Sequence, residues 1–384
     1  MAWSSYWDFF TYMTGGNHPF RYQCRLAEVP ELPALVRLPT GVGKTWAVLL
    51  AWAWRRLYHP DPAIRDATPR RLVYCLPARN LVEQTVAVAK SLRLDIPVYT
   101  MMGGEIEEGW YLYPEREAIL IGTIDILGSR ALNRGYAMSR YRWPIAFGLL
   151  NNDVLWVMDE VQLFGVGLET SAQLQAFRSK LGTFGPARTI WMSATLQPEW
   201  LGTVDHPVPE AVFELEPDEA EELAERLQAP KRLFRLDTGS VTDKGYAGRL
   251  AKSVLEHHQA GTLTLVICNT VERATQVFRE LEGRSQADLV LLHSRFRPPE
   301  RTAQLARLSA PMPPAGRIIA ATQTVEAGMD LDARTLITEL APWSSLVQRF
   351  GRCNRKGSCS EATVLWVDVS ERPRPYTAEE LEEA

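Results

Sequence analysis

Short apolar runs alternate with longer amphipathic stretches along this chain. Before residue 196 the runs are LVRL (35–38), RLVYCL (71–76), AILIGT (118–123), DVLWVMD (153–159) and TIWMSAT (189–195). After it they are TLTLVICN (262–269), DLVLLH (288–293), RIIAAT (317–322), RTLIT (334–338) and ATVLWVDV (362–369). Apolar strands separated by helices are typical of parallel sheets that are buried on both faces. The pattern predicts two tandem α/β domains.

Residues 197–235 interrupt this alternation. They are rich in proline and acidic residues, as in HPVPEAVFELEPDEAEELAERL, which indicates a connector that carries one charged, solvated helix. We therefore predict a first domain at 1–200, a linker at 201–235, a second domain at 236–370 and a tail at 371–384.

Length and composition limit the number of domains and the class of protein. The 384 residues exceed what one core usually supports, and 46% hydrophobic residues are enough to bury two. A net charge of -4 excludes a wholly basic surface but leaves room for a local basic groove. The five cysteines are scattered, which predicts reduced thiols. The longest apolar stretch, WAVLLAWAW, is too short for a membrane span, and the N-terminus lacks a positive leader, so we expect a cytoplasmic protein with no membrane partner.

A phosphate-binding loop follows the first apolar run. LVRL as a strand, PTGVG as a loop and a helix from Lys44 give the strand–loop–helix context that separates a phosphate cradle from a glycine turn before a buried helix. Thr40, Gly41 and Gly43 form the loop, whose N–H groups can surround phosphates. Lys44 can reach the β- and γ-phosphates, and the Thr45 hydroxyl can hold Mg²⁺. The pattern predicts ATP and magnesium as cofactors.

Two carboxylates follow the apolar run at 153–159. A nucleotide-hydrolysing site needs one carboxylate for Mg²⁺ and another to activate water. Asp159 and Glu160 are at the position where a strand is expected to end. We assign Asp159 to the metal and Glu160 to catalysis.

The DEVQ box at 159–162, the SAT at 193–195 and QRFGRCNR at 348–355 are marks of superfamily 2 helicases. That superfamily keeps TGVGKT-like loops in which the first position need not be glycine, which explains Leu38. Together with LPARNLVEQ, IGTIDIL, LLHSRF and TVEAGMDLD, these motifs make the chain resemble the CRISPR-associated helicase of type I interference systems from about residue 20 to residue 369. The resemblance implies two RecA-like domains with ATP bound between them.

The resemblance also implies roles for individual nucleotide-site residues. It places Gln23 on the adenine and Gly328 and Asp330 near the ribose. In the QRFGRCNR motif, Arg352 and Arg355 match the arginine-finger positions, with Gln348 beside them, because the transferring phosphoryl group needs positive charge from the second domain.

The box departs from the family pattern at its fourth position. The family commonly has histidine there, whereas this chain has Gln162. Glutamine still donates and accepts hydrogen bonds, so we expect Gln162 to couple the nucleotide site to Ser193 and Thr195 without titrating.

Nucleic-acid contacts are implied on both domains, and backbone phosphate is their natural target. The positions are Pro77, Arg79, Asn80, Gly103, Gly104 and Thr123 on the first domain and Asn269, Thr270, Ser294, Arg295 and Thr322 on the second. Residues 129–143, SRALNRGYAMSRYRW, interleave arginines with aromatic residues, as single-strand platforms do, although core packing explains such aromatics equally well.

The family's helicase works with a metal-dependent HD nuclease, and this sequence contains no adjacent His-Asp pair. We expect the nuclease to be a separate subunit or part of a longer chain. The resulting prediction is an ATP-dependent helicase or translocase that acts on single-stranded DNA displaced by a Cascade-like CRISPR surveillance complex. A superfamily 2 RNA helicase and a nucleotide-gated DNA-binding recruitment module remain the alternatives.

Overall fold

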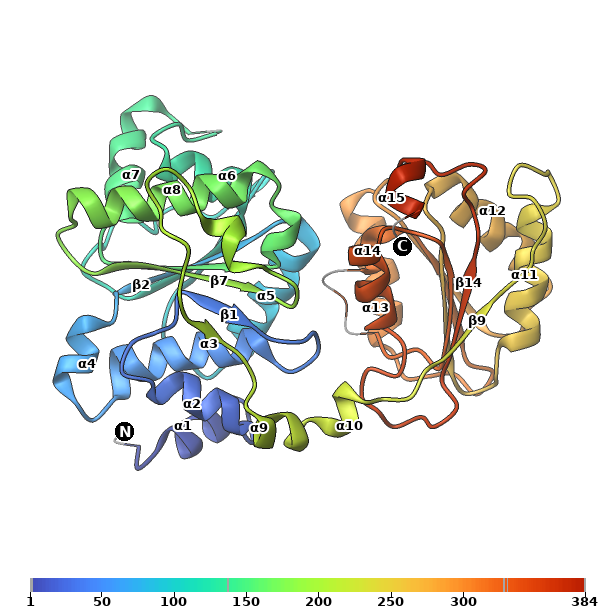
Figure 1. Cartoon of the computed structure of the whole chain (residues 1–384), viewed down its shortest axis with the longest axis horizontal. Helices are drawn as coiled ribbons and strands as arrows, with labels where there is room; N and C mark the ends of the chain where they lie inside the picture. Colours follow the sequence, from blue (N-terminus) through green and yellow to red (C-terminus); the bar gives the residue numbers. More distant parts are fainter. Residues whose placement is uncertain (1–2, 137, 327–328, 330, 383–384) are drawn as a thin grey trace. The chain divides into compact units, whose positions relative to one another are not determined.

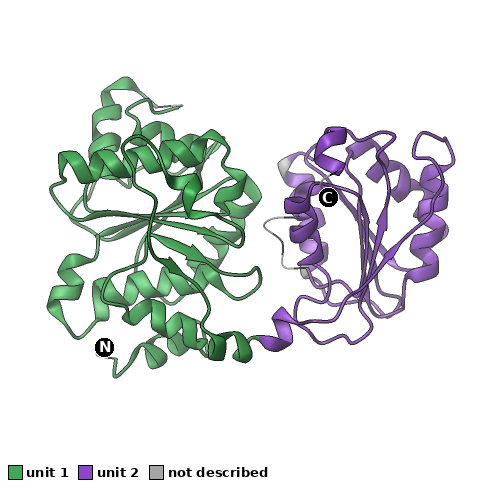
Figure 2. Cartoon of the chain, in the orientation of Figure 1, with its two compact units in different colours: residues 1–223 green, residues 224–384 purple. Residues whose placement is uncertain are grey.

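The computed structural model describes residues 3–136, 138–326, 329 and 331–382. The chain divides into two compact units, residues 1–223 and 224–384 (Figure 2). Each unit is built around one mainly parallel sheet, with eight strands in the first and six in the second. The predicted α/β fold class is confirmed.

Unit 1 holds an eight-stranded sheet in the order β4-β3-β5-β2-β6-β7-β1-β8 (Figure 1). Only the β3–β4 pair is antiparallel. The strands are β1 (Leu35–Arg37), β2 (Arg71–Leu76), β3 (Val98–Met102), β4 (Glu105–Ile106), β5 (Ala118–Thr123), β6 (Val154–Asp159), β7 (Ala187–Ser193) and β8 (Val212–Phe213). Every residue of β2, β5 and β6 is buried, as parallel strands covered on both faces require.

Helices cover both faces of this sheet. The α-helices are α1 (Tyr6–Met13), α2 (Arg21–Glu28), α3 (Lys44–Ala53), α4 (Pro62–Ala67), α5 (Arg79–Ser91), α6 (Ile124–Ala131), α7 (Trp143–Asn151), α8 (Val166–Leu181) and α9 (Pro217–Glu222). Shorter helical turns are Trp54–Tyr58, Arg140–Arg142, Val161–Leu163 and Pro198–Leu201. Helices α6, α7 and α8 contribute to one core with Trp156 and Trp191 of the sheet. Helices α1 to α4 lie on the opposite face (Figure 1).

Unit 2 holds a fully parallel sheet in the order β11-β12-β10-β13-β14-β9. Its strands are β9 (Arg232–Arg235), β10 (Leu263–Ile267), β11 (Asp288–Leu292), β12 (Arg317–Ala321), β13 (Thr335–Glu339) and β14 (Thr363–Val367). Its helices are α10 (Ala224–Leu227), α11 (Tyr246–His257), α12 (Val271–Leu281), α13 (Pro298–Ser309), α14 (Trp343–Phe350) and α15 (Ala378–Glu382), with a 3₁₀ turn at Gln323–Val325. One core joins the sheet to α11, α12 and α15, and a second core includes residues of α13 and α14.

The residues assigned to a linker are built into the two units. Strand β8 extends the first sheet through β1, and α9 is tied to α2 by the pairs Arg21–Asp218 and Arg25–Glu219. On the other side, β9 pairs with β14 in the second sheet. The unit boundary, between residues 223 and 224, falls within the range 201–235.

In the ranges that the structure describes, no helix is both long and apolar enough to cross a membrane.

Candidate functional site

The predicted nucleotide-site residues of the first domain gather at one edge of the sheet in unit 1. Strands β6, β7 and β1 are neighbours and parallel, so their carboxyl ends meet at the same edge. Beyond those ends come the 159–160 carboxylates, Ser193 and the 38–43 loop. The loop precedes the carboxylates by more than a hundred residues in the chain, and the sheet order brings the three segments together.

The loop between β1 and α3 has the backbone of a phosphate cradle. Gly41 and Gly43 have φ angles of 84° and 88°, a left-handed conformation that side chains disfavour. A Cβ atom at Gly43 would also lie 3.0 Å from the Gln23 amide nitrogen. Gly43 is the N-cap of α3, so the first N–H groups of this helix, which have no partner within the helix, lie at the end of the loop. The arrangement suits an anion at the end of β1.

Lys44 and two carboxylates form a buried charge cluster. The Lys44 side chain is only 8% exposed, and its ammonium lies 3.5 Å from both the Glu160 carboxylate and the Leu38 carbonyl. Glu160 has a φ of 55°, rare for a residue with a side chain. Burial raises the pKa of Asp159 to about 6, an effect that Lys44 opposes and Glu160 reinforces. One ammonium therefore faces two carboxylates in a low-dielectric site.

A hydrogen-bonded chain links Glu160 to the end of β7. The Gln162 amide donates to Glu160 Oε2 at 2.7 Å, and its oxygen accepts from the Ser193 hydroxyl at 2.7 Å. The Ser193 hydroxyl in turn accepts from the Thr195 backbone N–H at 3.0 Å. The three residues that we assigned to coupling thus form one hydrogen-bonded chain, which reaches the predicted catalytic carboxylate through Gln162.

Tyr74 is a member of this site that the sequence analysis missed. Its hydroxyl donates to Asp159 Oδ2 at 2.7 Å, and it also interacts with the Thr45 side chain. Burial, with a contribution from Asp159, raises the pKa of Tyr74 well above its usual value, so it remains a neutral donor. Tyr74 lies inside the apolar strand β2, where the sequence pattern indicates only a core residue. Only the neighbouring strand β6 reveals the partner.

The donor groups at this site suit Mg²⁺. The Asp159 carboxylate and the Thr45 hydroxyl both interact with Tyr74, and they are hard oxygen donors of the type that Mg²⁺ takes together with substrate phosphates. Among the residues described, no cluster of three or more His, Cys, Asp or Glu side chains is arranged as a metal site. Asp159 and Thr45 fit a cation that is shared with a nucleotide.

Gln23 packs directly on the phosphate loop. Its amide donates to the Gly43 carbonyl at 3.1 Å, and its oxygen accepts from the Phe20 backbone N–H at 3.0 Å. The neighbouring Tyr22 hydroxyl donates to the Val42 carbonyl at 2.7 Å. These bonds fix the loop, while the adenine contact of Gln23 stays a prediction.

The nucleic-acid candidates of unit 1 cluster beside this site. Pro77, Arg79 and Asn80 follow β2, Gly103 and Gly104 follow β3, and Thr123 ends β5. Strands β3, β5 and β2 are adjacent and parallel, so these positions share the carboxyl edge that carries the charge cluster. A Cβ atom on Gly104 would approach the Arg79 guanidinium to 3.9 Å, which places these two segments together.

The basic and aromatic stretch at 129–143 divides into two kinds of residue. Arg130 is buried, and burial lowers its pKa, whereas Tyr141 is 93% exposed. Arg142 pairs with Glu108 at 2.7 Å. Arg130 thus belongs to the core, and nucleic-acid contact stays a prediction for the exposed residues such as Tyr141.

Unit 2 repeats the arrangement on its own sheet. Asn269 and Thr270 follow β10, Ser294 and Arg295 follow β11, and Thr322 follows β12, on three adjacent parallel strands. Arg295 is exposed at this edge. Asn269 is buried and donates to the Leu340 carbonyl at 2.7 Å, so its side chain fixes the turn after β10.

The arginines of the QRFGRCNR motif differ in their surroundings. Arg352 is buried, and its guanidinium donates to backbone carbonyls of Val325 at 3.1 Å and Met329 at 2.7 Å. Arg355 is half-buried, and its backbone N–H donates to Asp332. Gln348 is buried on α14. The ribose candidates Gly328 and Asp330 lie outside the described residues.

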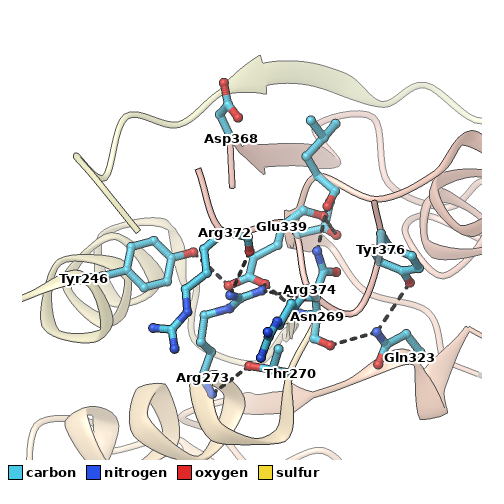
Figure 3. A network of polar contacts seen from close by, with 12 residues as sticks. Tyr246, Asn269, Thr270, Arg273, Gln323, Glu339, Asp368, Arg372, Arg374 and Tyr376 are labelled. Carbon is cyan, nitrogen blue, oxygen red and sulfur yellow. Dashed lines mark hydrogen bonds and ion pairs between the residues drawn. The ribbon is translucent and has the colours of Figure 1, made fainter. Parts of the chain in front are cut away.

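A second missed feature is a polar network at the centre of unit 2 (Figure 3). Glu339, at the end of β13, accepts from the Arg273 guanidinium at 2.7 Å, from the Tyr246 hydroxyl at 3.0 Å and from the Asn269 backbone N–H at 2.6 Å. Arg349, fully buried on α14, pairs with Glu326 at 2.8 Å and donates to the Asn269 side chain at 3.0 Å. The network joins the QRFGRCNR helix to the predicted nucleic-acid edge. The sequence signal was a charged residue at the end of a buried strand.

Two family models match the chain, one on each unit. Residues 27–203 match the DEAD/DEAH box helicase family, and residues 260–358 match the C-terminal region of the CRISPR-associated nuclease/helicase Cas3. The CRISPR-associated helicase Cas3 of Thermoproteus tenax is 27% identical over 92% of this chain and 60% of that protein. The chain therefore spans about three-fifths of this relative.

Solved structures share the fold. T. fusca Cas3-ATP superimposes with a TM-score of 0.65 at 19% identity, over 97% of this chain and 49% of that one. S. cerevisiae Dbp5 bound to RNA and ADP BeF3 gives 0.61 at 18% identity, over 95% and 87%. Together, the two family models and the Thermoproteus tenax relative make the chain similar to the Cas3 CRISPR-associated helicases, with a DEAD/DEAH box helicase match on unit 1 and a Cas3 C-terminal match on unit 2.

Proposed function

We propose that this chain is an ATP hydrolase that drives translocation along single-stranded DNA in type I CRISPR interference. The observation that carries the proposal is the buried Lys44–Asp159–Glu160 cluster at the sheet edge that also holds the nucleic-acid candidates of unit 1. A charge cluster with one ammonium for two carboxylates is unfavourable in isolation and fits a site that binds a phosphate–cation pair.

In the proposed reaction, water attacks the γ-phosphorus and the bond to the β,γ-bridging oxygen breaks, which releases ADP. Glu160 orients the water and takes its proton. Lys44 leaves its two long contacts and binds the β- and γ-phosphates, and N–H groups of the loop bind the same oxygens. Mg²⁺, held by Thr45 and Asp159, would supply charge neutralisation on the phosphates.

The remaining positive charge is assigned to unit 2. Arg355, with Arg352 as a positioning partner or second donor, is proposed to reach the γ-phosphate when single-stranded DNA binds both units and favours the closed state. Gln162, which is hydrogen-bonded to both Glu160 and Ser193, is proposed to couple the catalytic carboxylate to the carboxyl end of β7.

The CRISPR context comes from the family. We propose that the chain is recruited by a Cascade-like surveillance complex to the displaced DNA strand, and that an HD nuclease on another polypeptide, or on a longer form of this one, cuts the strand. Translocation from 3′ to 5′ is the direction that the family resemblance implies.

The test is ATP hydrolysis measured against the concentration of single-stranded DNA. We expect DNA to stimulate the unmutated chain, and we expect Arg355→Ala to lose the stimulated rate by ~10³-fold, the scale of an arginine finger, while ATP binding remains. Arg232→Ala is the matched control, since Arg232 is an exposed arginine on β9 outside the proposed site.

A third variant separates binding from catalysis. Arg295→Ala leaves the charge cluster intact, so saturating DNA should restore most of the rate, at a higher half-stimulating concentration that depends on salt. Equal rates with and without DNA would favour the recruitment module over the motor. Stimulation by RNA alone would favour the RNA helicase.

A further inference from the structure

Unit 2 carries a pocket that shares only Thr270 with the proposed nucleotide and DNA contacts. It has a volume of about 540 Å³ and lies between the start of α11, one face of α12 and the segment after β14. Thr270, a predicted nucleic-acid contact, lines its edge. The pocket is therefore continuous with the carboxyl edge of the sheet, next to the end of β10.

Five cationic and three acidic side chains line this pocket. Three of them are committed elsewhere, since Arg273 pairs with Glu339, Asp243 with Arg249, and Glu280 with Arg284. The others are Lys244, Arg279, Arg372, Arg374 and Glu272, and none of these forms an ion pair with a described residue. Among the lining side chains without an ion pair, positive charges thus outnumber negative ones by three, in a chain whose net charge is negative.

The buried network fixes the wall that carries two of these arginines. Arg273, held by Glu339, donates to the backbone carbonyls of Arg372 at 3.4 Å and Arg374 at 3.3 Å. The carbonyls point into the network, and the Arg372 and Arg374 side chains extend away from Glu339 (Figure 3). The backbone between them is thereby tied to α12, which lowers the entropic cost of presenting two guanidinium groups.

Guanidinium groups without carboxylate partners, gathered in a pocket, are suited to phosphate. We propose that this pocket binds backbone phosphates of the single-stranded DNA, as an extension of the path that begins at Thr270. This inference rests on the proposed function and adds contacts to the same strand. A free phosphate ion has the same chemistry, so the experiment must separate the two sources.

The experiment compares charge-matched variants of the full chain. Arg372→Gln/Arg374→Gln removes two pocket charges, and Lys244→Gln/Arg279→Gln removes two from the opposite walls. Arg232→Gln/Lys252→Gln is the control, because both residues are exposed on unit 2 and lie outside the pocket. Binding of a fluorescein-labelled oligothymidylate is followed by anisotropy over a range of salt concentrations, and thermal unfolding checks that each variant folds.

Each lost phosphate contact should reduce the slope of log K against log[salt] by about 0.7. We therefore expect each pocket pair to bind about tenfold more weakly at ~0.1 M salt with a slope shallower by about 1.4, and the control pair to keep the slope of the unmutated chain. Slopes of both pocket pairs equal to that of the control would overturn the inference.

The remaining outcomes are also decisive. If the unmutated chain fails to bind single-stranded DNA, the proposed function itself is wrong and the pocket inference fails with it. If it binds DNA but the pocket pairs lose only the binding of inorganic phosphate, measured by calorimetry, the pocket serves a free anion and the DNA path ends at Thr270.

Discussion

The two sheets place their charged residues at the same edge but balance them differently. In unit 1, Lys44 faces both Asp159 and Glu160, and burial, reinforced by Glu160, raises the pKa of Asp159 to about 6. Unit 2 holds two buried ion pairs, Arg273 with Glu339 and Arg349 with Glu326, at 2.7 and 2.8 Å, while the buried Arg352 donates to backbone carbonyls. Each matched group also has further hydrogen bonds.

This difference in charge balance distinguishes a candidate ligand-binding site from ion pairs that stabilise the fold. A matched and hydrogen-bonded pair offsets its own desolvation, so it holds the fold and has little to gain from a ligand. A mismatched cluster keeps an energetic cost that a phosphate–cation pair can relieve. Buried charge by itself therefore does not identify a functional site.

The largest effect is expected from breaking the mismatched cluster. Lys44→Ala should abolish ATP hydrolysis because the β,γ-phosphates lose their point charge, and Glu160→Gln should bind ATP but turn over ~10³-fold more slowly. Steady-state hydrolysis and equilibrium nucleotide binding measure the two effects. Lys90→Ala, at an exposed lysine paired with Glu107, is the control and should keep the full rate. Full turnover in Lys44→Ala would remove the proposed site.

Breaking a matched pair should affect stability more than the corresponding change in the cluster. Glu339→Gln leaves the Arg273 charge buried without a counter-charge and should cost about 3–5 kcal/mol in the free energy of unfolding. Asp159→Asn removes a disfavoured carboxylate but also loses an acceptor for Tyr74 or Glu160, so we expect a change of less than about 2 kcal/mol. Denaturant unfolding measures both. A larger loss in Asp159→Asn than in Glu339→Gln would refute the comparison.

An intermediate effect is expected from the hydrogen-bonded chain beside Glu160. Gln162→Ala removes both of its bonds and should slow DNA-stimulated hydrolysis by about tenfold while ATP binding remains, since each bond is worth about 1 kcal/mol. Gln162→His restores the residue common in the family and should recover part of the rate. If Gln162→Ala keeps the parental rate and DNA dependence, the chain is not a coupling element.

The smallest effect should come from Tyr74→Phe. This change removes one hydrogen bond to Asp159, worth about 1 kcal/mol, without changing the shape of the core. We expect the Mg²⁺ concentration for half-maximal hydrolysis to change by a few-fold and the saturated rate to stay similar. Tyr99→Phe, a tyrosine of β3 packed against the core that α6, α7 and α8 share with the sheet, is the control. A loss of rate at saturating Mg²⁺ would assign Tyr74 to catalysis instead.

The local elements were predictable because they depend on local pattern. All ten predicted apolar runs overlap a strand, and α3 begins at Lys44, directly after the glycine loop, as TGVGKT indicates. Strands β3, β4, β8 and β9 were not predicted. Of these, β4 and β8 have only two residues each, and β9 is an exposed edge strand, so neither length nor a buried apolar run marked them.

The sequence by itself determined the two α/β units and the residue types of the nucleotide site, because strand periodicity and a phosphate loop are encoded within a few consecutive residues. The tertiary structure alone decided that Tyr74 meets Asp159 and that Glu339 joins Asn269, Arg273 and Tyr246. These contacts join strands and helices that are far apart in the chain, and strand order, which no local pattern specifies, brings them together. Which buried charges lie together is likewise decided only by the tertiary structure.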